Sequence, residues 1–376
     1  KVTGSISSGD FKASMRLVSS HQPLKPEMEV DANKGEEKDK PFISPFALPF
    51  GPYAYESLPT QKDFWLQNAY IWTSGPQGNI EGDLIVSGGE ILFVGTHDKA
   101  IEFLKDSQAV WTEFDARGMH VTPGLIDCHS HTGIERGVNE VGQAITAEVN
   151  IGTSTNPDDV NWYRQLAGGL TTVNTLHGSA NPIGGQNQVN KLRWGVSHPD
   201  EMHFKGAMPG IKFALGENVK RKQSRYPNTR MGVESVFRER FQAANEYLAR
   251  HQKYKDGEIG VAPRRDLELE ALSEILLSKR LIHCHSYRQD EILMLCRVAG
   301  DFGFRIGTFQ HILEGYKVAE IIREHAIGGS AFSDWWAYKV EVQDAIPFAG
   351  AIMHKAGMVV SFNSDDSEMA RRMNLE

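Results

Sequence analysis

Short apolar runs alternate with amphipathic stretches through most of the chain after residue 121. Apolar runs of strand length occur at 121–126, 170–176, 211–215, 281–284, 305–310, 327–332 and 357–362. Apolar residues at helical spacing fill several of the intervals, namely 233–254, 267–279, 291–298 and 316–324. Strand–helix alternation of this kind predicts a parallel sheet with right-handed crossovers.

The length of this alternating region suggests how the sheet is arranged. Residues 120–376 number 257 (376 − 120 + 1), close to the ~250 residues typical of an eight-stranded βα barrel. We therefore predict an α/β fold in which 121–376 form a (β/α)8 TIM-like barrel. A doubly wound open sheet is the alternative, although its glycine-rich nucleotide loop is not evident after the first strand.

The pattern before residue 121 is different. Three strand-like segments, 64–72, 83–86 and 91–95, the last two joined by a two-glycine turn, predict a small β-sandwich subdomain at 61–120. Residues 1–60 contain a mixed charge run without apolar periodicity and a stretch rich in proline and aromatic residues. We expect this N-terminal segment to be extended and irregular.

Composition narrows the class of protein. The 376 residues carry a formal net charge of −8, which provides no basic face for nucleic acid, and no apolar run is long enough to span a membrane. The odd number of cysteines (Cys128, Cys284 and Cys296) does not suggest a disulfide framework. The linker-like N-terminus and the absence of an initiator Met favour an exported protein, periplasmic or secreted, over a cytoplasmic one.

Metal-binding residue types gather at the ends of the predicted strands. His129 and His131 follow the first strand, and the i, i+2 spacing directs both side chains to the same side. Another His-x-His pair, His283 and His285, ends the strand that starts at 281, and His311 follows the next one. Because catalytic residues of βα barrels lie at the carboxyl ends of the strands, these histidines predict a metal site.

The first of these motifs resembles a known family. The run Pro123-Gly124-Leu125-Ile126-Asp127-Cys128-His129-Ser130-His131 is similar to the strand-one signature of the amidohydrolase superfamily. The resemblance covers about residues 60–376 and is strongest to the imidazolonepropionase-like and prolidase-like branch. It implies a metal-dependent hydrolase on a βα barrel, with a small β subdomain preceding it.

The resemblance also implies the ligands. His129 and His131 would bind the first metal, His283 would be the fifth-strand ligand, and His311 the sixth-strand ligand. Asp365, after the last strand, would bind metal and move the proton of the attacking water. Zinc is the expected divalent ion, as one or two ions, with manganese or iron as alternatives.

The fourth-strand ligand has two candidates. Lys212 matches the Ile-Lys segment in which two-metal relatives carry a carboxylated lysine, and we favour it. Glu217 is the alternative because it lies nearer the strand end. As a helix-start carboxylate it also has an ordinary structural explanation.

Further residues are candidates for substrate contact. His285 shares a strand face with His283 and would polarise a carbonyl, or else be a hydrogen-bonded core histidine. A loop after the second strand, a helix start and an aromatic pair supply the others, which are His177, Asn181, Gln186, Arg288 and Trp335. A surface position is the simpler interpretation for Arg288, and Asp366 is expected to be a helix cap.

The resulting hypothesis is a metal-dependent amidohydrolase that cleaves a C–N bond in a small-molecule or dipeptide substrate, such as a cyclic amide or amidine. A metal-dependent deaminase of a small ring substrate is the alternative within enzymes, and a non-catalytic barrel scaffold is the alternative outside them. The sequence is also compatible with a homo-oligomer. The chain ends ten residues after Asp366 (376 − 366), where relatives continue, so we expect a fragment of a longer protein.

Overall fold

A computed structural model describes residues 3–8, 11–16, 60–220, 225–332 and 337–375. The chain divides into two compact units, Lys1–Phe46 and Ala47–Glu376. In the first unit, β1 (Thr3–Ser8) and β2 (Phe11–Arg16) pair as antiparallel strands. The prediction of an irregular segment was therefore wrong for these residues. Gly9-Asp10 between them is a sequence typical of two-residue hairpin connections, a signal that the charge pattern obscured.

The β region before the barrel sequence forms one mixed sheet. Its strands lie in the order β5-β4-β3-β6, with β7 also pairing with β3, and α1 follows β5. Their bounds are β3 Phe64–Trp72, β4 Asn79–Ser87, β5 Glu90–Gly95, α1 His97–Leu104, β6 Thr112–Asp115 and β7 His120–Val121. The predicted hairpin is confirmed: Gly88 and Gly89 have φ of 59° and 81°, as a two-residue turn of the mirror-image type requires. Among the described residues this region is a single sheet and not a sandwich.

The later strands form two sheets. One has the order β11-β9-β8, and the other has the order β10-β12-β13-β14-β15-β16. From β12 to β16 every neighbouring pair is parallel, as the alternating pattern predicted, whereas β10 and β11 each pair antiparallel with their neighbours. The bounds are β8 Leu125–Ser130, β9 Leu170–Thr175, β10 Ile183–Gln186, β11 Gln188–Lys191, β12 Gly210–Ala214, β13 Leu281–His285, β14 Ile306–Gln310, β15 Ala326–Ala331 and β16 Val359–Phe362.

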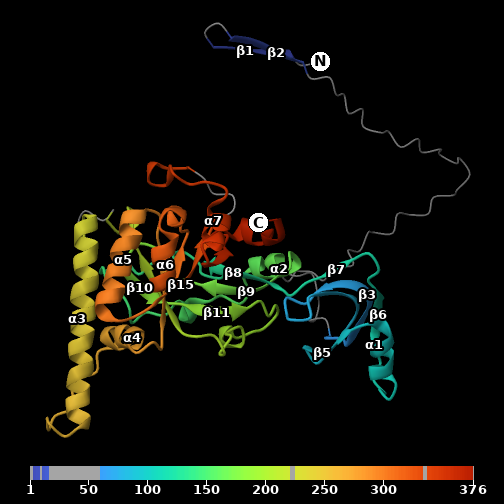
Figure 1. The fold of residues 1–376 in the computed structure, drawn as a ribbon, viewed down its shortest axis with the longest axis horizontal. Helices are drawn as coiled ribbons and strands as arrows, with labels where there is room; N and C mark the ends of the chain where they lie inside the picture. The colour runs from blue at the N-terminus through green and yellow to red at the C-terminus, as the bar shows by residue number, and fades with distance from the viewer. Residues whose placement is uncertain (1–2, 9–10, 17–59, 221–224, 333–336, 376) are drawn as a thin grey trace, which may run out of the picture. The chain divides into compact units, whose positions relative to one another are not determined.

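Helices pack on the outside of the parallel strands (Figure 1). They are α2 Val160–Ala167, α3 Arg230–Lys255, α4 Leu267–Leu276, α5 Gln289–Phe302, α6 Ala319–His325, α7 Ala349–Lys355 and α8 Ser367–Ala370. The main core lies between the strands and these helices. Phe213 of β12 stacks on Phe237 of α3, with ring centroids 5.4 Å apart, and both side chains are fully buried. In the described residues no helix is long and apolar enough to cross a membrane.

The first and last parallel strands meet without a regular ladder. Cys128 of β8 contacts the Ser361 hydroxyl of β16 at 3.2 Å and donates to the carbonyl oxygen of Phe362. Beyond the strand, the Asp365 N–H donates to the carbonyl oxygen of His129 at 3.2 Å. Within the described ranges the ladder hydrogen bonds therefore stop short of a closed barrel, and these contacts join the two edges.

Candidate functional site

The first histidine of the first motif, His129, lies within a strand, and His131 directly follows that strand. Sequence periodicity predicted a strand over 121–126, but β8 spans Leu125–Ser130 and carries His129 within it. Asp127, fully buried on the same strand, holds this end of β8 in place. Its carboxylate accepts hydrogen bonds from the His129 N–H at 3.1 Å and from the Ser364 hydroxyl at 2.5 Å. Burial raises the pKa of Asp127 to about 6 despite these bonds.

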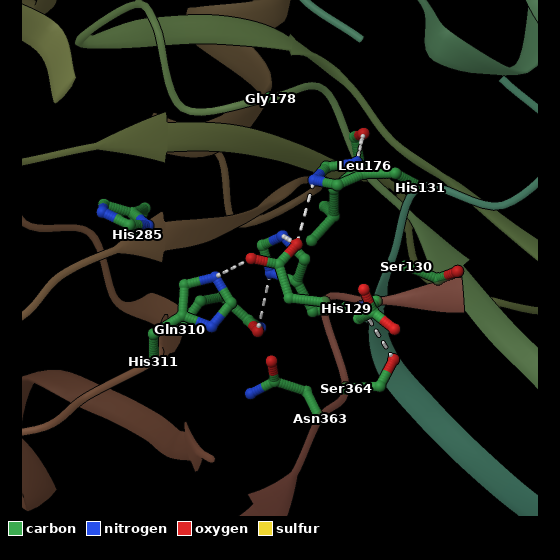
Figure 2. Close-up of polar contacts among 12 residues, drawn as sticks. His129, Ser130, His131, Leu176, Gly178, His285, Gln310, His311, Asn363 and Ser364 are labelled. Atoms are coloured by element: carbon green, nitrogen blue, oxygen red, sulfur yellow. Dashed lines mark hydrogen bonds and ion pairs between the residues drawn. The ribbon is translucent and has the colours of Figure 1, made fainter. Parts of the chain in front are cut away.

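Three histidines converge on one carboxylate. The Nε2 atoms of His129 and His131 lie 3.4 and 3.2 Å from Oδ1 of Asp365, and Nε2 of His311 lies 3.5 Å from its Oδ2. Lys212 enters the same group from β12, with its Nζ 3.1 Å from His129 Nε2. Figure 2 shows the three histidines gathered around this space. One ligand atom each from His129, His311 and Asp365 lies within 4.8 Å of the others.

Hydrogen bonds behind the rings fix which nitrogen faces the group. His131 Nδ1 lies 2.8 Å from the carbonyl oxygen of Leu176, which can only accept, so Nδ1 carries the hydrogen. His129 Nδ1 lies 3.2 Å from Oε1 of Gln310, again an acceptor. Both Nε2 atoms therefore present lone pairs toward Asp365. Buried partners of this kind typically orient metal-binding histidines.

Burial favours the neutral forms of His129 and His311, and the surroundings of Asp365 keep its carboxylate charged. Burial lowers the pKa of His311 to about 3 and that of His129 well below its usual value. Burial alone would raise the pKa of Asp365, but His311, His131 and Lys212 together hold it at about 2. Burial lowers the pKa of Lys212 to about 8, so a neutral amine becomes accessible near neutral pH.

Two members of the group sit on strained backbone. His311 and Asp365 have φ of 56° and 50°, in the left-handed region that residues other than glycine seldom adopt. His311 directly follows β14, and Asp365 lies three residues after β16. Such strain concentrates at functional sites, where the surrounding structure holds it. The left-handed conformation turns the segments after β14 and β16 inward, so that the side chains of His311 and Asp365 lie close together.

Among the described residues, the group has two partly exposed members, His131 and Asp365. The side chains of His131 and Asp365 are 25% and 24% exposed, whereas those of His129 and His311 are fully buried. Lys212 is also fully buried. A substrate would therefore approach over His131 and Asp365.

The two histidines of the second His-x-His pair lie at different depths along β13. His285 reaches the group, with its ring centroid 5.2 Å from that of His311 and its Nε2 3.3 Å from Nδ2 of Asn218. His283, predicted to be the fifth-strand ligand, lies two residues deeper, where its Nδ1 contacts the Thr308 hydroxyl at 2.8 Å. The parallel register pairs His283 with Lys212 and His285 with Ala214, the last residue of β12. The structure therefore brings His285 into the group, and not His283.

The structure also separates the two fourth-strand candidates. Lys212 points into the histidine group, whereas Glu217 pairs with Lys339, its Oε1 lying 2.9 Å from Nζ. Glu217 lines a neighbouring cavity of about 510 Å³ whose lining contains none of the site histidines. The Glu217 N–H also donates to the buried carboxylate of Glu341 at 2.8 Å, so Glu217 stabilises this loop.

The predicted substrate residues of the loop after β9 are occupied with internal hydrogen bonds. His177 accepts from the Glu140 N–H at 2.8 Å and donates from Nδ1 to the carbonyl oxygen of Gly178. Asn181 donates to the Thr146 hydroxyl at 2.8 Å and accepts from Arg225. Gln186 donates to the carbonyl oxygen of Ala147 at 3.0 Å. These hydrogen bonds hold the loop together.

The remaining predictions lie further out. Arg288 pairs with Asp290 at 3.0 Å as the N-cap residue of α5, the surface position expected of it. Asp366 caps α8, accepting from the N–H groups of Glu368 and Met369, as predicted. Trp335 lies outside the described residues.

Sequence reasoning missed three residues that border the group. Tyr287 packs edge-on against His285, with ring centroids 4.5 Å apart, and Asn218 contacts the same histidine. Gln310 orients His129 from β14. A usable signal existed for Gln310 and Tyr287, because both lie within two residues of predicted site histidines at strand ends.

Comparisons with known proteins show which proteins the chain is similar to. No known family profile matches the sequence. The amidohydrolase tasK of Hapsidospora irregularis is 28% identical over an alignment of 351 positions, which covers 81% of this chain and 35% of that protein. This chain thus spans about a third of the length of that curated relative. The crystal structure of an amidohydrolase from Thermotoga maritima MSB8 is 30% identical with a TM-score of 0.72, covering 82% of this chain and 80% of that one.

Proposed function

We propose that this chain, which belongs to the amidohydrolase superfamily, is a metal-dependent hydrolase that cleaves a C–N bond in a cyclic amide, an amidine or a dipeptide. The observation that carries this proposal is the convergence of three imidazole Nε2 atoms on Asp365 at 3.2–3.5 Å. Neutral imidazoles and a carboxylate in this arrangement are a ligand set for zinc and related ions.

The donor chemistry fits a divalent cation. Lone pairs on His129 and His131 already face inward because each Nδ1 hydrogen is taken by an acceptor behind the ring. His311 is neutral at physiological pH, and Asp365 supplies negative charge. We propose His129, His131, His285, His311 and Asp365 as the ligands. When bound, the cation supplies Lewis-acid activation of water and of the substrate carbonyl.

Asp365 is the group suited to move the proton. Its carboxylate is ionised over the whole physiological range and is partly exposed on the side from which a substrate approaches. In the proposed reaction one of its oxygens accepts a proton from the attacking water and delivers it to the leaving nitrogen. His131, exposed to a similar extent beside it, borders the same approach.

Lys212 is the proposed fourth-strand ligand, as its carbamate. The amine is fully buried and becomes neutral near pH 8, and only the neutral amine adds to CO₂. That addition forms an N–C bond and releases one proton, leaving a carbamate with two oxygens beside His129. Placement of Lys212 inside the group, and of Glu217 outside it, supports this assignment.

We further propose that the two sheets are parts of one (β/α)8 barrel. The side-chain and backbone contacts between β8 and the β16 region support closure at that edge. A closed arrangement would place the ends of β8, β12, β13, β14 and β16 around one centre, as the converging side chains require.

Metal content tests the proposal. Elemental mass spectrometry on protein purified without chelator should find about one or two equivalents of metal, and His311→Asn should lose most of it. The matched control is His354→Asn, which changes an exposed histidine on α7 and should retain the metal. A panel of dipeptides, cyclic amides and ring amines would then identify hydrolysis or deamination. Metal-free wild-type protein without activity after metal addition would overturn the proposal.

A further inference from the structure

A line of hydrogen bonds, fully buried at its His129 end, runs from β13 through β14 to β8. His283 Nδ1 contacts the Thr308 hydroxyl at 2.8 Å, Gln310 Nε2 donates to the same hydroxyl at 2.6 Å, and Gln310 Oε1 lies 3.2 Å from His129 Nδ1. Gln310 and His129 are fully buried. Figure 2 shows Gln310 lying beside His129. The proposed reaction does not use His283 or Thr308 directly.

Two acceptors compete for the single proton of a neutral His129. Gln310 Oε1 faces Nδ1, whereas the Asp365 carboxylate lies 3.4 Å from Nε2. Lys212 Nζ lies 3.1 Å from the same Nε2 and can donate to it, which opposes a proton on that nitrogen. Asp365 alone, as a charged acceptor, would draw the proton toward Nε2. A proton there would remove the lone pair that faces the site. The proton stays on Nδ1 when an acceptor at that nitrogen, together with Lys212 at Nε2, outweighs Asp365.

The acceptors at Nδ1 of His131 and of His129 differ in how firmly they keep the proton on that nitrogen. His131 donates to the carbonyl oxygen of Leu176, which has no donor to offer. His129 faces a side-chain amide, which could present either its oxygen or its NH₂ group after a half-turn. The orientation of the Gln310 amide therefore has to be set by its other neighbour, Thr308.

A hydroxyl is itself ambiguous because it both donates and accepts. His283 removes that ambiguity when its Nδ1 accepts the Thr308 proton, since Oγ1 is then left only to accept from Gln310. This requires the hydrogen of His283 to lie on Nε2. Across Gly210 from that nitrogen is Oδ1 of Asn187, a buried acceptor without a hydrogen-bond partner in the described part of the chain.

We propose that His283, Thr308 and Gln310 form a directional relay that holds His129 in the Nδ1–H tautomer, with its Nε2 lone pair facing the metal site. Each member donates toward Asn187 and accepts from the side of His129. His283, the sequence-predicted ligand, is thus a positioning residue that acts through Thr308 and Gln310. The inference rests on the proposed metal function for its purpose, but the tautomer itself is a property of the metal-free protein.

The test separates acceptor chemistry from packing. Gln310→Met removes the acceptor but keeps the volume, whereas Gln310→Glu keeps an acceptor oxygen facing His129. Gln165→Met is the matched control, because Gln165 is also fully buried and donates to a threonine hydroxyl, that of Thr132, at 2.8 Å. Thr308→Val is a second route to the same loss if Gln310→Met does not fold.

The primary measurement is the His129 tautomer, read from imidazole ¹⁵N shifts in metal-free, ¹⁵N-histidine-labelled protein and assigned by the signals lost in His129→Asn. Wild type, Gln310→Glu and Gln165→Met should show Nδ1–H, whereas Gln310→Met and Thr308→Val should shift toward Nε2–H. Zinc affinity by competition titration should weaken about 10–100-fold in the shifted variants only.

Two results would overturn the relay: an Nε2–H tautomer in wild type, or an unchanged tautomer in both Gln310→Met and Thr308→Val. An equal shift in Gln165→Met would also overturn it, since the effect would then be general loosening. Failure of the proposed function alone would give a different result. The wild-type protein would bind no zinc, but its His129 tautomer would still change in Gln310→Met and Thr308→Val as predicted.

Discussion

Lys212 should make the stability of the metal-free protein depend on pH in a predictable way. Burial lowers its pKa from 10.5 to about 8, and the folded chain therefore binds fewer protons than the unfolded chain between those pH values. Unfolding free energy rises with pH wherever the unfolded state binds more protons. The buried cation thus destabilises the fold below pH 8, and this penalty disappears as pH rises to 10.5.

The two pKa values fix the size of the effect. Linkage gives a penalty of roughly 3.3 kcal/mol at pH 7 and roughly 1.4 kcal/mol at pH 9.5. Lys212→Met removes the titrating group while keeping a chain of similar length. The difference in unfolding free energy between wild type and Lys212→Met should therefore change by about 2 kcal/mol between the two pH values, in favour of wild type at high pH.

Guanidinium unfolding in CO₂-free buffer with chelator measures this difference, since CO₂ or metal would alter the amine. Other titrating groups, such as the buried Cys296, are common to both proteins and cancel in the comparison. Lys99→Met changes an exposed lysine on α1 and should show the same difference from wild type at both pH values. A Lys212→Met difference equally insensitive to pH would refute the argument that burial desolvates a cation here.

Three further predictions follow from the site and the core. Asp365→Asn should lower kcat about 10²–10⁴-fold in the metal-loaded enzyme, measured with the substrate found by the panel, because the amide cannot accept the proton; near wild-type kcat would exclude Asp365 as the base. Gly210→Ala should lower the unfolding free energy by about 1–3 kcal/mol, because its Cβ would lie 2.3 Å from Asn187 Oδ1 and 2.6 Å from His283 Nε2; an unchanged melting temperature would contradict that crowding. Phe241→Ala, which leaves a void beside three phenylalanine rings, should cost about 3–5 kcal/mol in denaturant unfolding, whereas a loss below 1 kcal/mol would mean that the core collapses around it.

Periodicity predicted most of the parallel strands and long helices because their apolar patterns are long and uninterrupted. Strands β12, β13 and β14 lie within one or two residues of the predicted ranges, and so does most of α3. The strand carrying the first histidine motif was placed about four residues early. Val121 belongs to the preceding sheet, where β7 pairs with β3, and Pro123 separates it from β8.

The site was harder to predict because its decisive distances join different strands. Spacing identified His283 and His285 as equivalent members of one face, and only the register with Lys212 shows that they lie at different depths. Hydrogen bonds likewise distinguish the loop residues from substrate-binding ones. His177 and Asn181 have side chains suited to substrate contact, but these side chains are already bonded to backbone groups. A sequence lists residue types and does not show which of their atoms are already bonded.

The left-handed backbone at His311 and Asp365 also restricts how this centre can evolve or be redesigned. Histidine and aspartate are among the few residues apart from glycine that tolerate such φ values, so the chemistry and the conformation select the same residue types. In a saturation library at either position, glycine and asparagine should therefore survive in the soluble fraction, whereas valine and isoleucine should be depleted before any screen for activity begins. New ligand types would have to enter this site at His129, Lys212 or His285, whose backbones lie in regular strands.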